Sequence, residues 1–141
     1  MQRLCYVSQA NFSLPQDRQQ LTDILSEARN FNAKNRIQGV LYFADGHFLQ
    51  CLEGAPAALD GVMQKIRQDP RHQNVQIITM EENTTAIFNT WAMKFISRHH
   101  VIKLFFSELG YNSFCPQQLN RVQLNQLLHL MYQIEASDLV A

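Results

Sequence analysis

The sequence lacks a net charge, a long apolar run and a complete set of metal-binding cysteines. Its 141 residues include 12 basic and 12 acidic side chains, so no bulk field attracts nucleic acid or an anionic membrane. No apolar run approaches the roughly 18 residues needed to span a bilayer, and the first residues lack the apolar core of a signal peptide. These absences predict a cytoplasmic protein with no membrane contact and no direct nucleic-acid binding.

Cysteine is scarce and irregularly spaced. Cys5, Cys51 and Cys115 are odd in number, show no Cys-x-x-Cys spacing, and in the first two cases lie in expected strands. Such thiols are expected to be reduced and buried rather than bridged or bound to zinc. The histidines have no carboxylate or further histidine at ligand spacing, so we expect no metal site.

The hydrophobic patterns predict the order β-α-β-β-α-β-β, which contains the split βαβ unit of ferredoxin-like α+β folds. The first helix begins at the Ser13 start signal or a few residues later, and the second begins at residue 56 and ends at Asp69-Pro70. The expected strands cover residues 4–8, 37–43, a segment centred on residue 50, 75–80 and 91–96.

Both faces of the expected sheet need cover, because residues of either parity are apolar in the first and third strands. Two crossover helices cover only one face of such a sheet. Two C-terminal helices, over residues 101–109 and around residues 124–134, are expected to cover the other face. We therefore predict a core domain over residues 1–97 and a two-helix extension over residues 98–141, packed on the sheet.

The most informative residue is Gln50, a primary amide in an otherwise apolar strand. Burying it without a partner costs roughly 1–3 kcal/mol, so a polar group should face it. If Tyr6, Gln50, and the pair Trp91 and Met93 lie on the strand faces beneath the crossover helices, they converge on one cleft. Asn32, at the end of the first helix, joins them there. This set contains no carboxylate pair and no nucleophile with a base.

Five ordered motifs carry a family resemblance. They are Arg3-Leu4-x-Tyr6-x-Ser8, Asn32 followed by Ile37-x-Gly39, Gly46-x-Phe48-Leu49-Gln50-x-Leu52-Glu53-Gly54, Asp69-x-Arg71-His72 and Trp91-x-Met93. Together they resemble the BLUF domain, a blue-light sensor that uses flavin. The two further helices make the chain similar to the short form of that family, in which the sensor carries no enzymatic output domain.

The resemblance implies that residues 1–97 bind FAD noncovalently and that the chain is a photoreceptor rather than an enzyme. It implies that Tyr6 donates an electron to the photoexcited flavin and that Gln50 relays hydrogen bonds to the flavin N5 and O4 atoms. Asn32 would hold the O4 and N3 edge of the ring. Trp91 and Met93 would be an alternating pair near Gln50, one of which moves into or out of the pocket.

The remaining expected cofactor contacts are Ser8, Lys65, Arg71 and His72. Lys65, and Arg71 with His72 just beyond the second helix, are expected to approach the diphosphate or adenine side of FAD. Arg29 is a weaker candidate.

The chain departs from the family in one position. Phe31 stands where the family has a second asparagine directly before Asn32. A second amide contact is therefore open, and Asn30 is a partial replacement.

Taken singly, these residues also fit structural roles. Tyr6, Trp91 and Met93 are typical of a core, a buried amide such as Gln50 also satisfies loop backbone, and Arg71 follows a turn where solvated charge is usual. Two other functions stay open: a small flavin-dependent oxidoreductase and a ferredoxin-like interaction module without cofactor. The leading expectation is a photoreceptor that signals through the fifth strand or the tail helices to a downstream protein, with a homo-oligomer also open.

Overall fold

The computed structural model describes residues 1–14, 16–82, 85–88 and 91–137. Its elements are β1 (Gln2–Ala10), α1 (Arg18–Lys34), β2 (Gln38–Ala44), β3 (His47–Gly54), α2 (Pro56–Gln68), β4 (His72–Glu82), β5 (Lys94–Ser97), α3 (His100–Glu108), the 3-10 turn η1 (Pro116–Gln118) and α4 (Arg121–Gln133). The sheet order is β4-β1-β3-β2-β5. Only the β2–β5 pair is parallel among the described strands. The predicted ferredoxin-like α+β fold is confirmed.

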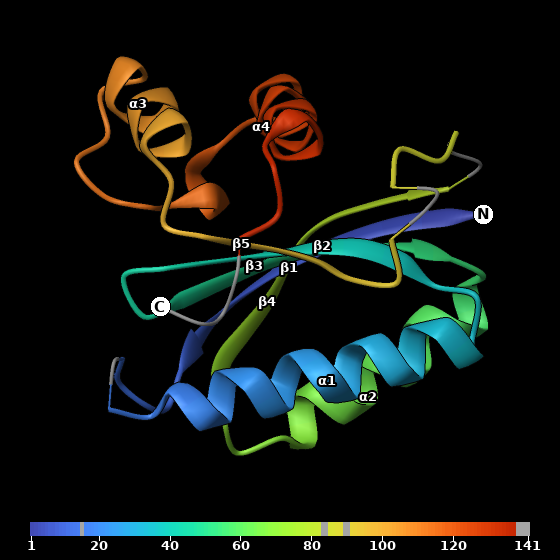
Figure 1. Cartoon of the computed structure of the whole chain (residues 1–141). Coiled ribbons are helices and arrows are strands. Elements are labelled where there is room, and N and C mark those ends of the chain that lie inside the picture. Colours follow the sequence, from blue (N-terminus) through green and yellow to red (C-terminus); the bar gives the residue numbers. More distant parts are fainter. Residues whose placement is uncertain (15, 83–84, 89–90, 138–141) are drawn as a thin grey trace.

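Helices cover both faces of the sheet, as predicted. Figure 1 shows α1 and α2 on one face and α3 and α4 on the other. Each helix pair closes its own apolar core: Leu25 and Leu59 pack with Leu52 on the first face, and Leu127 packs with Cys51 on the second. Strands β1, β2 and β3 are thus buried on both sides, which explains their nearly continuous apolar sequences, whereas most residues of the edge strand β4 are only partly buried or exposed. The division of the chain at residues 97 and 98 stays a prediction.

Local signals explain several element boundaries. The β2–β3 hairpin turns through Asp45 and Gly46 with φ of 53° and 73°, the left-handed conformation that two-residue hairpins need. Asn120 and Gln123 form a reciprocal capping box at the start of α4. At the start of the first helix, Ser13 instead forms a turn with Asp17, and α1 begins at Arg18.

The last two strands differ in length from the prediction. β4 is longer than residues 75–80, because it pairs with β1 from Ala10↔His72 to Gln2↔Glu82. β5 is shorter than residues 91–96, because its parallel ladder with β2 begins only at Lys94. Residues 91–93 therefore approach the sheet outside the ladder.

The thiols are free, and two are fully buried. Cys5 and Cys51 lie opposite each other on β1 and β3, and burial raises the pKa of the Cys51 thiol. Cys115 is half-buried. Within the described ranges, no helix has the length and apolarity required to cross a bilayer.

Candidate functional site

Tyr6 and Gln50 face each other at the centre of the sheet. They are paired residues of β1 and β3, both are buried, and the Tyr6 hydroxyl donates a hydrogen bond to Gln50 Oε1. Gln50 Nε2 donates to Met93 Sδ at 3.8 Å. Burial raises the pKa of Tyr6 well above its ordinary value, so the phenol keeps its proton. The Gln50 amide thus has the polar partner that its sequence context predicted.

A narrow cleft lies between α1 and α2, and Gln50 forms part of its lining. Asn32, Gln50, Lys65, Arg71 and His72, all predicted cofactor contacts, line the cleft. Its enclosed volume is about 80 Å³, below the roughly 300–1,000 Å³ of sites that hold such ligands. The other lining residues are Ile24, Glu27, Ala28, Phe31, Val62, Ile66 and Asp69.

Ion pairs of Arg71 cross the mouth of this cleft. Arg71 Nη2 lies 2.7 Å from Asp69 Oδ2, beyond α2, and 2.5 Å from Glu27 Oε2 on α1. Burial alone would raise the pKa of Asp69, but the hydrogen bonds from Arg71 outweigh it and lower that pKa. Arg71 is therefore engaged by two carboxylates rather than being the solvated charge that its turn suggested.

Lys65 stands over the ring of Phe31, with Nζ 4.3 Å from the ring centre. The residue that departs from the family pattern thus supports a cation–π contact inside the cleft. Asn30 is exposed and is absent from the residues that line the cleft.

His72 brings an unpaired buried nitrogen to the cleft. Its Nδ1 lies 2.9 Å from Ser8 Oγ, whereas Nε2 is buried with no partner among the described residues. Burial lowers the pKa of His72 to about 4, so the ring is neutral at pH 7. In either tautomer Nε2 is left without a hydrogen bond, which costs about 1–3 kcal/mol. Ser8 does not line the cleft and acts on it by holding His72.

Asn32 and Arg29 both hold the segment that carries Met93. Asn32 Nδ2 donates to Ala92 O at 2.6 Å, and Arg29 Nε donates to Met93 O at 3.2 Å. Asn32 is 2% exposed. These bonds hold the peptide groups before and after Met93, and so aim the Met93 side chain at Gln50.

The prediction that Trp91 and Met93 share a face is wrong. Met93 belongs to the core beneath α1 and α2, but Trp91 packs on the opposite face. The Trp91 ring lies 5.4 Å from that of Tyr132 on α4 and 4.2 Å from Lys94 Nζ. Strand alternation fails here because residues 91–93 precede the β5 ladder.

A buried ion pair that the sequence reasoning missed anchors the approach to this segment. Glu53, 1% exposed, accepts hydrogen bonds from Arg3 Nη2 at 2.9 Å and from the backbone N–H groups of Ile87 and Phe88. Arg3 also donates to Thr85 O at 2.8 Å. The available signal was the same as for Gln50: an ionisable side chain inside an apolar strand.

A family model described as "Sensors of blue-light using FAD" (BLUF) matches residues 1–94. The chain belongs to the BLUF family. BLUF proteins of known structure share its whole architecture. BlsA in its photo-activated state is 39% identical with a TM-score of 0.91, covering 97% of this chain and 98% of that chain. BlrB in its dark state is 26% identical with a TM-score of 0.74, covering 92% of each.

Some BLUF relatives are much longer. The photoactivated adenylate cyclase subunit beta of Euglena longa is 42% identical over 77 residues, which cover 55% of this chain and 9% of that protein. The chain thus spans a small part of the curated relatives it matches. BLUF domains therefore occur both nearly alone, as in BlsA, and joined to longer chains.

Proposed function

We propose that this BLUF protein is a cytoplasmic blue-light photoreceptor that binds FAD noncovalently between α1 and α2, catalyses no reaction of its own and signals to a separate protein. The observation that carries the proposal is the buried set of hydrogen bonds that joins Tyr6, Gln50 and Met93, in which Gln50 lines the cleft. When bound, FAD supplies absorption of blue light and an acceptor for an electron and a proton.

The cleft has groups suited to a flavin, and the ion pair between Glu27 and Arg71 across its mouth is weak. Asn32 and Gln50 present amides, and His72 Nε2 is a buried polar atom in need of a partner. The enclosed space is too small for the ring, so α1 and α2 must separate to admit it. The pair between Glu27, in the middle of α1, and Arg71, just beyond α2, involves a Glu27 side chain that is 64% exposed. An exposed pair of this kind contributes about 0–1 kcal/mol.

Tyr6 and Gln50 are arranged for coupled electron and proton release. The Tyr6 phenol is protonated, and its electron leaves readily only if the proton can move along a hydrogen bond. Gln50 Oε1 already accepts that bond. An amide both donates and accepts hydrogen bonds. Rotation or tautomerisation of Gln50 therefore exchanges the donor and the acceptor that it presents to its neighbours. Its opposite contact is to the weak acceptor Met93 Sδ, so the amide loses little when it turns.

Lys94, the residue after Met93, connects the Gln50 site with α4 on the opposite face of the sheet. Met93 contacts Gln50, while the next residue, Lys94, donates to the carbonyl oxygens of Met131 and Tyr132 at 2.8 and 3.0 Å. These carbonyls belong to the last turn of α4, where a cation is favourable. A shift of Met93 is thereby felt at the end of α4. The two-state element that such coupling requires is the segment of residues 91–94.

The test is spectroscopic. The purified protein should be yellow with FAD, and blue light should shift the flavin bands slightly and reversibly to the red. Gln50→Leu should bind FAD and show no shift. Colourless protein that refuses FAD would favour an interaction module, and yellow protein that is bleached by NAD(P)H without photoswitching would favour an oxidoreductase. A full shift in Gln50→Leu would rule out the proposed role of the amide.

A further inference from the structure

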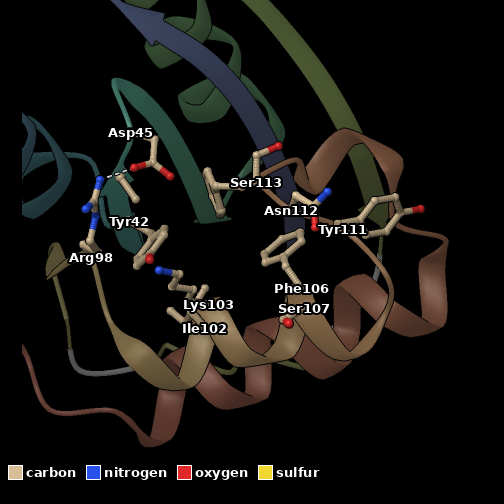
Figure 2. Close-up of a pocket in the computed structure, with 12 residues that line it drawn as sticks. Tyr42, Asp45, Arg98, Ile102, Lys103, Phe106, Ser107, Tyr111, Asn112 and Ser113 are labelled. Atoms are coloured by element: carbon tan, nitrogen blue, oxygen red, sulfur yellow. Dashed lines mark hydrogen bonds and ion pairs between the residues drawn. The ribbon is translucent and has the colours of Figure 1, made fainter.

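A second cavity lies on the face of the sheet opposite the candidate flavin site. It is enclosed by the β2–β3 turn, α3 and the segment after α3, as Figure 2 shows. Its volume is about 430 Å³, within the roughly 300–1,000 Å³ typical of sites for small ligands. No residue lines both this cavity and the cleft between α1 and α2. It is therefore a separate site.

The inner wall is aromatic and apolar. Phe114 lies between the rings of Tyr42 and Phe106, with ring centres 4.9 and 5.3 Å away. Ile102, one turn before Phe106 on α3, completes this wall. These side chains are held by the core, since Tyr42, Ile102 and Phe106 are each at most 2% exposed. A rigid wall of this kind suits a flat apolar group.

The Tyr42 hydroxyl on this wall can donate a hydrogen bond into the cavity. The Tyr42 oxygen accepts a hydrogen bond from His99 N at 3.2 Å. The hydroxyl proton has no acceptor in the part of the chain that the structure describes. Burial raises the pKa of Tyr42, so the proton stays on the oxygen at neutral pH. Tyr42 is thus a donor without an acceptor at the edge of the cavity.

One of the cations around the cavity forms no ion pair with the described residues. Arg98 forms an ion pair with Asp45, drawn as a dashed line in Figure 2. Lys103 forms no ion pair with any described residue. Figure 2 shows its amine directed toward the Tyr42 hydroxyl. A single negative charge would therefore be matched here, whereas a doubly charged group would meet the Asp45 carboxylate at the same rim.

We propose that this cavity binds a small aromatic monocarboxylate. Its carboxylate accepts hydrogen bonds from the Lys103 ammonium and the Tyr42 hydroxyl, and its ring packs against the half-buried ring of Phe114. Both polar contacts are then satisfied by one anionic group, and the apolar wall is covered by one ring. Ser107, Asn112 and Ser113 at the rim offer further hydrogen bonds.

The proposal can be tested by calorimetric titration of the FAD-loaded full chain with phenylacetate and with phenylacetamide, its neutral analogue of nearly equal shape. Phenylacetate should bind with a dissociation constant below about 1 mM, which for ten heavy atoms lies within known ligand efficiencies. Phenylacetamide should bind about tenfold more weakly or not at all. Lys103→Gln should weaken phenylacetate binding about tenfold, because a charge-assisted hydrogen bond is lost.

Two further variants keep the result interpretable. Tyr42→Phe retains the ring of the wall and should weaken phenylacetate binding severalfold, whereas Lys34→Gln, an exposed change on α1, should leave it unchanged. The flavin absorption spectrum of each variant reports that the sheet is intact. The absence of phenylacetate binding up to about 10 mM would overturn the proposal, as would equal binding of the amide or undiminished binding by Lys103→Gln.

Discussion

Glu53→Gln tests whether the buried ion pair holds the chain segment that leads to Met93. The Glu53 carboxylate is buried and is shared by Arg3 and two backbone N–H groups, of Ile87 and Phe88. The amide keeps the size and one acceptor but removes the charge opposite a buried guanidinium. We expect the free energy of unfolding to fall by about 2–3 kcal/mol, since hydrogen bonds to charged groups contribute about that much and Arg3 keeps only its more distant carboxylate, Glu81 at 3.5 Å.

The measurement is urea unfolding at a fixed excess of FAD, because bound cofactor itself adds to apparent stability. Glu27→Gln is the matched control: it removes an exposed partner of Arg71 and should cost only about 0–1 kcal/mol. Arg3→Met combined with Glu53→Gln should lose less than the sum of the single changes, because both single changes remove the same contact between Arg3 and Glu53. A loss for Glu53→Gln no larger than that of the control would refute the anchoring role.

Three further predictions concern single side chains. The folded-state pKa of His72, about 4, lies below its usual value near 6.5, so as pH falls the unfolded chain binds the proton first and the free energy of unfolding should decrease from about pH 6.5 to 4. In His72→Gln the free energy of unfolding in urea should depend less on pH over that range. An unchanged dependence on pH would contradict the assignment. Tyr6→Phe should retain FAD but lose the light-induced absorption shift, because the electron and proton donor is gone; a persistent shift would exclude Tyr6. Lys94→Met should speed amide hydrogen exchange at the end of α4, where Met131 and Tyr132 lose their bonds; exchange as slow as in Lys94→Arg would show that the amine does not hold the helix.

The meeting of Tyr6 and Gln50 was predictable because it depends on strand alternation and on antiparallel pairing of β1 with β3. Trp91 was misplaced because alternation holds only within a strand, and β5 begins at Lys94. The partners of Glu53 are backbone N–H groups of a loop, which no side-chain pattern reveals. The pairing of Arg71 with Glu27 likewise depends on how closely α1 and α2 approach, and no periodic pattern in the sequence predicts the distance between two helices.

The cleft between α1 and α2 and the cavity beside α3 differ in what the sequence could indicate. Asn32, Gln50, Arg71 and His72 of the cleft belong to motifs with fixed spacing, so the resemblance to BLUF domains could single them out as candidates. Tyr42 and Lys103 belong to no such motif, and each is unremarkable in its own element. Only the packing of α3 against β2 brings a spare donor and a spare cation to one aromatic wall.

In the proposed mechanism, light changes the hydrogen bonds of the Gln50 amide itself. The direct measurement is the light-minus-dark infrared difference spectrum of FAD-loaded protein with and without ¹⁵N in the glutamine side chains, compared with the same pair of samples for Gln50→Leu. The account predicts label-sensitive difference bands in the wild type that vanish in the variant. A wild-type difference spectrum that the label leaves unchanged would contradict it.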